Sequence, residues 1–144
     1  MYSIALRFAE KFSPEEGTIK AHQRIIDEKG FVWYGKMGNT VSDSNISKVL
    51  SQENPRILLI HSGGTERYWA YISDIKKERP PVEDFPEYYR NMADKFKTWF
   101  CVRKFEMAEK GVMAKCIVAS SKASLSNASR HSMSPYFLIE FNEE

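Results

Sequence analysis

The sequence contains several short runs with the composition of β-strands, and this pattern most limits what the chain can fold into. In the first run, Tyr2, Ile4, Leu6 and Phe8 alternate with small or polar residues, which is the period of a strand with one buried face. Further strands are predicted over residues 31–37, 56–61, 68–72, 99–106, 113–119 and 136–141. No long helical crossover separates consecutive strands, whereas a parallel pair needs a connection of a dozen or more residues. The pattern therefore favours antiparallel or mixed pairing.

Two helices are predicted between the first strands. Ser13, Pro14 and Glu16 have the residue types and spacing of a capped helix start. An apolar stripe follows until Gly30, which suits the left-handed position after a helix end. A second, short helix is predicted to begin near Ser42 and to end before the proline at position 55. Both helices are expected to pack against the sheet rather than to carry a site.

The remaining segments complete the predicted fold. Residues 88–97 and part of the polar run 120–134 predict short helices, whereas three prolines within 79–86 predict an extended, irregular connection. The chain of 144 residues has the size of one domain, so we expect a single domain over residues 1–144. The predicted fold class is α+β, with a small mixed, curved β-sheet or open β-barrel and peripheral short helices.

Composition bears on the compartment in which the protein works. Cys101 and Cys116 lie in strand-like surroundings rather than in a CxxC pair, which indicates buried thiols in a reducing compartment. No signal peptide opens the chain, and no apolar run approaches the ~20 residues needed to span a bilayer. We therefore expect a cytoplasmic protein without a membrane partner.

The distribution of charge is more informative than the net charge of +2, which does not by itself identify a polyanionic partner. No carboxylate lies between Glu109 and Glu140, but that stretch contains Lys110, Lys115, Lys122 and Arg130. One interpretation is a solvated surface that lacks acids, and the other is a surface that faces phosphates. On the second interpretation, Lys122 and Arg130 are predicted phosphate contacts.

Three histidines are the first candidates for catalysis, because histidine is the commonest general base near neutral pH. His22 lacks metal-ligand spacing and is predicted to lie on the surface or cap its helix, and His131 belongs to no motif. His61 ends a buried strand before Ser62 and Gly63, where backbone amides become available to a ligand. It is either a ligand contact or an ordinary strand-end residue. No metal or cofactor signature is present, so no cofactor is predicted.

The aromatic residues, 13% of the chain, are the strongest sign of a binding site. Side chains alternate across a strand, so Trp33 and Tyr34 are not both expected to face one core, which leaves one large ring for another role. Trp69 and Trp99 also have aromatic neighbours on their strands. Aromatic rings stack on nucleobases for about 1–3 kcal/mol each. The alternative is that all three tryptophans fill a core or an interface.

Several stretches of the chain together resemble the PUA-like superfamily, and within it domains of the EVE and YTH type. The first is FVWYGKMG at 31–38, followed by the strand pair 57–61 and 68–72. Later stretches are PEYYR at 86–90, WFCV at 99–102, VASS at 118–121, SL at 124–125 and SMSPYF at 132–137. The helical opening before the first tryptophan departs from the usual start of an EVE domain.

The resemblance implies a small barrel that reads nucleic acid and accepts a modified base in an aromatic cage. It implies that Trp33, Trp69 or Trp99 stacks a flipped base, while backbone groups at Gly35, Ser62 and Gly63 meet the edge of the base. Tyr34 and His61 complete the predicted ligand contacts. The predicted phosphate contacts also include Lys36, Arg103 and Lys104.

These observations predict a non-catalytic module that binds DNA or RNA. Some domains of this type stand at the front of modification-dependent restriction ATPases, so a larger ATPase or nuclease is a predicted partner. Two alternatives remain open. One is a protein-interaction domain with exposed aromatic residues, and the other is a small hydrolase that uses His61 and Ser62.

Overall fold

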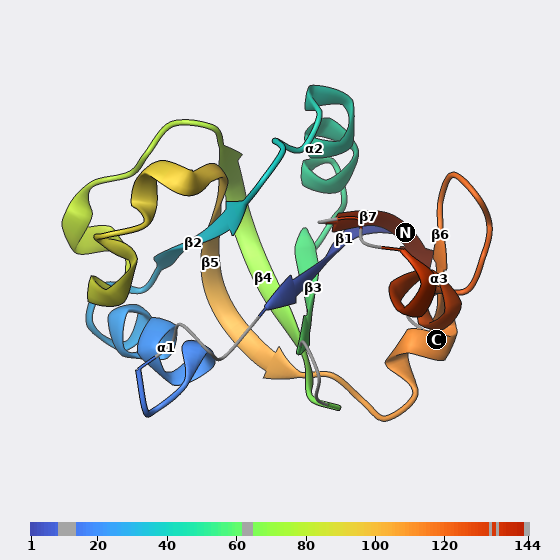
Figure 1. The fold of residues 1–144 in the computed structure, drawn as a ribbon, viewed down its shortest axis with the longest axis horizontal. Helices are drawn as coiled ribbons and strands as arrows, with labels where there is room; N and C mark the ends of the chain where they lie inside the picture. Colours follow the sequence, from blue (N-terminus) through green and yellow to red (C-terminus); the bar gives the residue numbers. More distant parts are fainter. Residues whose placement is uncertain (9–13, 62–64, 133, 135, 143–144) are drawn as a thin grey trace.

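Seven strands form one sheet in the computed structural model, which describes residues 1–8, 14–61, 65–132, 134 and 136–142 (Figure 1). The order of the strands across the sheet is β2-β5-β4-β3-β1-β7-β6. Their bounds are Tyr2–Phe8 (β1), Val32–Met37 (β2), Arg56–His61 (β3), Arg67–Lys76 (β4), Phe96–Met107 (β5), Cys116–Val118 (β6) and Tyr136–Phe141 (β7).

The sheet is mixed, as predicted. β1 and β3 pair in parallel, with Leu6 opposite Leu59, and the other neighbouring strands pair antiparallel. The long connection through α1, β2 and α2 makes this one parallel pair possible. Register shifts in β4 next to β5 increase the bend of the sheet, and β5 curves across the molecule in Figure 1. The predicted α+β class with a curved, open sheet is therefore confirmed.

In the described part of the chain, three short helices lie around the sheet: α1 (Thr18–Lys29), α2 (Asp43–Leu50) and α3 (Leu125–His131). The predicted start of α1 at Pro14 is wrong, because the chain makes a turn in which Gly17 N–H donates to the Pro14 carbonyl at 2.9 Å. Gly17 then has a φ of 96°, which is incompatible with a right-handed helix. Ser13 lies outside the described residues. The predicted left-handed Gly30 is confirmed, with a φ of 87°.

The segment 82–96 covers one end of the sheet and contains three turns of 3-10 helix rather than the predicted helix over 88–97. The turns are Val82–Asp84, Glu87–Tyr89 and Ala93–Lys95, and β5 already begins at Phe96. Aromatic packing decides this course, because Phe85 and Phe96 both pack against Trp99 of β5. The predicted strand over 113–119 is also shorter. A 3-10 turn occupies Val112–Lys115, and only Cys116–Val118 pairs with β7.

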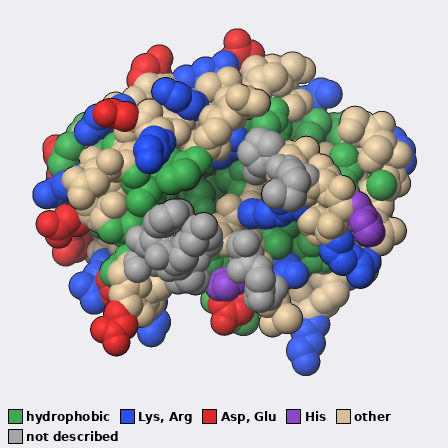
Figure 2. Space-filling view, viewed as in Figure 1, with side chains coloured by type: hydrophobic (Ala, Val, Ile, Leu, Met, Phe, Trp, Pro, Cys, Tyr) green, Lys and Arg blue, Asp and Glu red, His purple; other side chains and the backbone are tan. Residues whose placement is uncertain are grey.

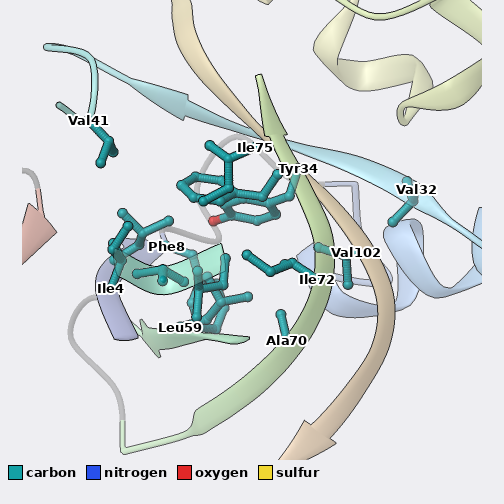
Figure 3. Packing of buried hydrophobic residues seen from close by; sticks show 14 residues of the cluster. Ile4, Phe8, Val32, Tyr34, Val41, Leu59, Ala70, Ile72, Ile75 and Val102 are labelled. Atoms are coloured by element: carbon teal, nitrogen blue, oxygen red, sulfur yellow. The ribbon is translucent and has the colours of Figure 1, made fainter. Parts of the chain in front are cut away.

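Buried side chains cover both faces of the sheet. Tyr34 belongs to the main cluster, with residues of β1, β3, β4 and β5 (Figure 3). Trp33 points to the opposite face and packs in a second cluster with Phe85 and Trp99. The prediction that one of these two rings is left over is wrong, because the segment 82–96 buries the face on which Trp33 lies. Among the described residues, no helix is long and apolar enough to cross a membrane.

Candidate functional site

A pocket of about 290 Å³ opens beside the edge strand β2, and we call it the β2 pocket. Its lining residues are Leu6, Arg7, Phe8, Thr18, Tyr34, Gly35, Lys36, Met37, Tyr88, Tyr89, Met92, Phe96 and Ser134. None of these described lining residues is an acid. Figure 2 shows hydrophobic side chains exposed in the middle of one face of the molecule, next to Lys and Arg side chains. The volume is near the lower end of the ~300–1,000 Å³ that small-ligand pockets have.

Aromatic rings form much of the wall of the β2 pocket. Tyr88 and Tyr89 follow one another in the second 3-10 turn, with ring centres 4.9 Å apart. The ring of Tyr89 lies 4.5 Å from that of Phe96. Phe8 and Tyr34 line the pocket from β1 and β2, and both belong to the main core cluster (Figure 3). The pocket is thus a hollow at the edge of the core rather than a separate surface groove.

A chain of hydrogen bonds holds Tyr89 and Gly35 of the β2 pocket in place. His22 of α1 is 0% exposed, and its Nδ1 lies 2.8 Å from the Thr18 carbonyl, so Nδ1 carries the proton. Its Nε2 then accepts from the Tyr89 hydroxyl at 3.0 Å, and the Tyr89 oxygen accepts from Gly35 N–H at 3.4 Å. Burial lowers the pKa of His22 to about 4, which keeps the ring neutral in this chain. The predicted surface role of His22 is therefore wrong.

Gly35 is required where β2 passes beneath the aromatic segment. A Cβ atom at this position would lie 2.5 Å from Cδ2 and 2.7 Å from Cγ of Phe96. Because the N–H and C=O of one strand residue point to the same side, the Gly35 carbonyl also points away from β5, toward the free edge of the sheet. The backbone of Gly35 therefore lies at the pocket wall, which is where the predicted contact between its backbone groups and a ligand requires it.

Lys36 is the most unusual residue of the pocket. Its side chain is 5% exposed, and its ammonium donates to the Met37 carbonyl at 3.0 Å and to the Asn39 carbonyl. It also lies 5.1 Å from the ring centre of Tyr136. Among the described residues, no carboxylate is within ion-pair distance of it. Burial lowers the pKa of Lys36 below its usual value.

Two other predicted contacts, Trp33 and Arg103, meet in a second pocket of about 570 Å³ on the opposite face of β2. Trp33 is 8% exposed, and Lys76 lies 5.6 Å from its ring centre. Arg103 lies 6.0 Å from the ring centre of Phe31 and bonds the Ser73 hydroxyl at 3.2 Å. The structure therefore brings a tryptophan and basic residues together here, but not with Tyr34 and Lys36.

Trp69 lines a third pocket of about 270 Å³, which we call the Trp69 pocket. It is 4% exposed, and the Arg56 guanidinium lies 4.3 Å from its ring centre. Arg56 also lies 4.8 Å from the ring of Phe141 and donates to the Tyr71 hydroxyl at 2.9 Å. A side chain of the protein itself therefore occupies a position against the indole where a base would stack. The predicted role of Trp69 in binding remains a prediction.

The remaining predicted contacts are dispersed. Trp99 is 0% exposed, beneath Phe85 and Phe96, and it lines none of these three pockets. Lys104 follows Arg103 at a register shift between β4 and β5, and it pairs with Glu106 at 3.4 Å and lies 5.4 Å from the ring centre of Tyr71.

Lys122 and Arg130 lie in the basic segment near the C-terminus. Lys122 pairs with Glu140, and Arg130 bonds the Asn127 side chain of its own helix at 2.9 Å. Lys115 of the same segment pairs with Glu109 at 3.6 Å. The carboxylates that flank the segment in sequence thus fold back onto two of its lysines. Whether Lys122 and Arg130 contact phosphate remains a prediction.

The predicted site around His61 is described only in part. The His61 ring packs edge-on against Phe8, with ring centres 5.0 Å apart, and Phe8 lines the β2 pocket. Ser62 and Gly63 lie outside the described residues, so the proposed His61 and Ser62 pair is not described either. Among the described residues, no group of three or more His, Cys, Asp or Glu side chains has the geometry of a metal site.

Sequence reasoning missed the residues that 3-10 turns and long-range packing bring to the pocket, above all Tyr88, Tyr89 and Phe96. One signal was available, since the two tyrosines lie in the PEYYR stretch that carries part of the family resemblance. His22 gave no such signal. Its partner Tyr89 is 67 positions away in the sequence, and only the packing of α1 against the 3-10 turn brings the two together.

The family model described as Pua-like matches residues 4–136 of this chain. The matched range extends from within β1 to the first residue of β7 and includes every residue that lines the β2 pocket. The comparison with curated proteins gave no significant match, and neither did the comparison with solved structures. The family model thus covers most of the sheet and the whole candidate site.

Proposed function

The chain belongs to the Pua-like family, and on this premise we propose that it is a non-catalytic module that holds one base of a nucleic acid in the β2 pocket. Pua-like domains generally bind nucleic acids. The observation that carries the proposal is the β2 pocket, in which five aromatic residues and a buried lysine meet without an acid among the described lining residues. A stacked base gains about 1–3 kcal/mol, which offsets the few kcal/mol needed to flip it.

We further propose that the bound base carries a modification, as the resemblance to EVE and YTH domains implies. Met37 and Met92 line the β2 pocket together with the aromatic rings. Methionine side chains are flexible and polarisable, so they adapt to an additional alkyl group on a base. The Gly35 backbone at the pocket wall supplies polar groups that distinguish the edges of different bases.

In the second pocket, whose lining includes Glu78 and Asp84 as well as basic residues, the cations are the proposed contacts of the flanking nucleic acid. Lys76 and Arg103 lie beside the rings of Trp33 and Phe31 there, and among the described residues neither cation forms an ion pair with a carboxylate. Phosphates are the expected partners of such cations. We propose that DNA or RNA extends from the β2 pocket past this surface, and that a larger ATPase or nuclease acts on the bound strand.

The test is a titration of labelled single-stranded DNA and RNA, with and without base modifications, against Tyr88→Ala. Tyr88 is only partly buried, so its removal leaves the core intact while it takes one stacking surface from the pocket. We expect the affinity to fall about 5- to 150-fold, which corresponds to the loss of one stacked ring. Fluorescence anisotropy measures the affinity, and circular dichroism checks the fold.

Tyr2→Ala is the matched control, because Tyr2 is also partly buried but lies at the other end of β1, away from the pocket. It should leave the affinity unchanged. Equal affinities of wild type and a folded Tyr88→Ala would rule out a base in the β2 pocket. Failure of the wild type to bind any of the oligonucleotides would rule out the proposed function as a whole.

A further inference from the structure

Lys36 is a buried cation without a carboxylate partner among the described residues. A buried ammonium loses its hydration, and burial without a counter-charge is unfavourable. Two carbonyl oxygens and the face of Tyr136 compensate only in part, because neither carries a full negative charge. The described lining of the β2 pocket contains no acid. The described residues therefore place a positive charge at a pocket wall without a carboxylate beside it.

The position of Lys36 divides the β2 pocket into two sides. Tyr88, Tyr89 and Phe96 come from the segment 82–96 and form the aromatic side. Lys36 reaches toward β7, where Tyr136 lies, and Ser134 lines the pocket from the connection just before that strand. A flat ring fits the aromatic side. A group that accepts hydrogen bonds and carries negative charge fits the Lys36 side.

The ammonium also has an unused donor. Of its three N–H groups, two donate to the carbonyls of Met37 and Asn39, and no described residue accepts from the third. A ligand oxygen in the pocket is a suitable acceptor. Charge-assisted bonds to an anionic oxygen are about twice as strong as bonds between neutral groups, and phosphate offers several such oxygens.

We propose that Lys36 binds a phosphate of the nucleotide whose base occupies the β2 pocket, so that the pocket recognises a nucleotide as a unit rather than a base alone. This inference rests on the proposed function, because it assumes that a base lies against the aromatic side. It assigns Lys36 to ligand selection.

The experiment compares the four nucleoside 5′-monophosphates with the matching nucleosides by calorimetry on the full chain. The wild type should bind at least one monophosphate about 10-fold or more tightly than its nucleoside, since a hydrogen bond to a charged group contributes about 1.5–3 kcal/mol. Lys36→Met should remove this difference, so that the monophosphate and its nucleoside bind this variant with affinities within about 2-fold of each other. Lys36→Arg, which keeps the charge, should retain part of the preference.

Two controls keep the result interpretable. Lys110→Met removes the same charge from an exposed position far along the chain and should leave the preference unchanged. Methionine fills the space of the Lys36 stem without a buried charge, so Lys36→Met should stay folded, and thermal unfolding checks this. If it does not fold, Lys36→Gln replaces it.

The outcome separates this inference from the proposed function. Equal affinity of the wild type for nucleosides and monophosphates overturns the inference, as does a preference that survives in Lys36→Met. If oligonucleotide binding still depends on Tyr88 in that case, the proposed function stands without the phosphate contact. If nothing binds the wild type, both fail.

Discussion

The β2 pocket and the Trp69 pocket have nearly the same volume, about 290 and 270 Å³, and both combine aromatic rings with a basic side chain. They differ in how the basic group is satisfied. Arg56 lies against Trp69 and Phe141 and donates to Tyr71, and Glu106 and Glu109 line the same pocket. Among the described residues, the ammonium of Lys36 contacts two carbonyl oxygens and the ring of Tyr136.

The comparison shows that residue types alone do not identify a binding site. A cation that stacks on an aromatic face of its own protein, with acids nearby, stabilises the fold. A buried cation that lacks an acid keeps a charge that is compensated only in part. Both pockets have aromatic rings and basic side chains in their linings, and the contacts of the basic side chains differ between them.

The largest expected effect that tests this contrast is on Trp69. Trp69→Ala should lower the free energy of unfolding by about 3–5 kcal/mol, because it removes a buried ring and the surface against which Arg56 packs. Chemical denaturation measures this loss. Trp69→Phe keeps a ring and should remain folded, with oligonucleotide affinity equal to that of the wild type. A clear loss of affinity in folded Trp69→Phe would instead support the sequence-based prediction that Trp69 contacts the ligand.

The next effect concerns His22, which supports the β2 pocket and has no counterpart in the Trp69 pocket. The groups packed around it are Tyr34, Tyr88, Tyr89 and Phe105, and none is an acid. Its pKa of about 4 lies below the ordinary value of 6.5, so the folded state binds the proton less readily than the unfolded state. The stability contribution is complete above about pH 6.5 and is lost as the pH falls toward 4.

This loss amounts to about 3 kcal/mol, because one unit of pKa corresponds to about 1.36 kcal/mol. Urea midpoints of wild type and His22→Gln between pH 7 and pH 4 measure it as a difference, in which the titration of other groups cancels. The wild type should lose stability faster than His22→Gln over this interval. His131→Gln, at an exposed position, should follow the wild type. Parallel pH profiles for wild type and His22→Gln would contradict the assignment.

The smallest expected effect is at Gly35. Gly35→Ala should destabilise the fold by about 1–3 kcal/mol, because the added Cβ lies 2.5 Å from the Phe96 ring. It should also weaken ligand binding, since Phe96 lines the β2 pocket. The double variant Gly35→Ala with Phe96→Leu tests the cause, because a smaller side chain at 96 should recover part of the loss. Additive losses in the double variant would show that the clash is not with Phe96.

Much of the fold was predictable from local patterns. The alternation in β1, the left-handed Gly30 and the strand pair β3 and β4 all follow from neighbouring residues, and the structure confirms them. The segment 82–96 was not predictable in this way. Its course depends on the packing of Phe85 and Phe96 against Trp99. The pattern of residues within the segment does not predict such contacts.

The residues of the candidate site also divide into those that the sequence predicted and those that only the structure revealed. Trp33, Tyr34, Gly35 and Lys36 were predicted because they lie together in one strand-like stretch, whereas Arg103 was predicted as a phosphate contact that the family resemblance implies. The structure separates Trp33 and Arg103 from Tyr34 and Lys36 by the two faces of β2, and it adds Tyr88, Tyr89 and His22 to the second pair. Because side chains alternate along a strand, adjacent residues are expected on opposite faces of the sheet. The alternation does not determine which segment of the chain covers each face.

The sequence by itself determined that this chain forms short strands with buried, aromatic-rich faces, because alternation and turn residues act over a few positions. It also determined the family, through stretches that span most of the chain. Only the tertiary structure decided which aromatic residues surround a cavity and which fill the core. That decision depends on contacts between residues far apart in sequence, such as Gly35 with Phe96 and His22 with Tyr89.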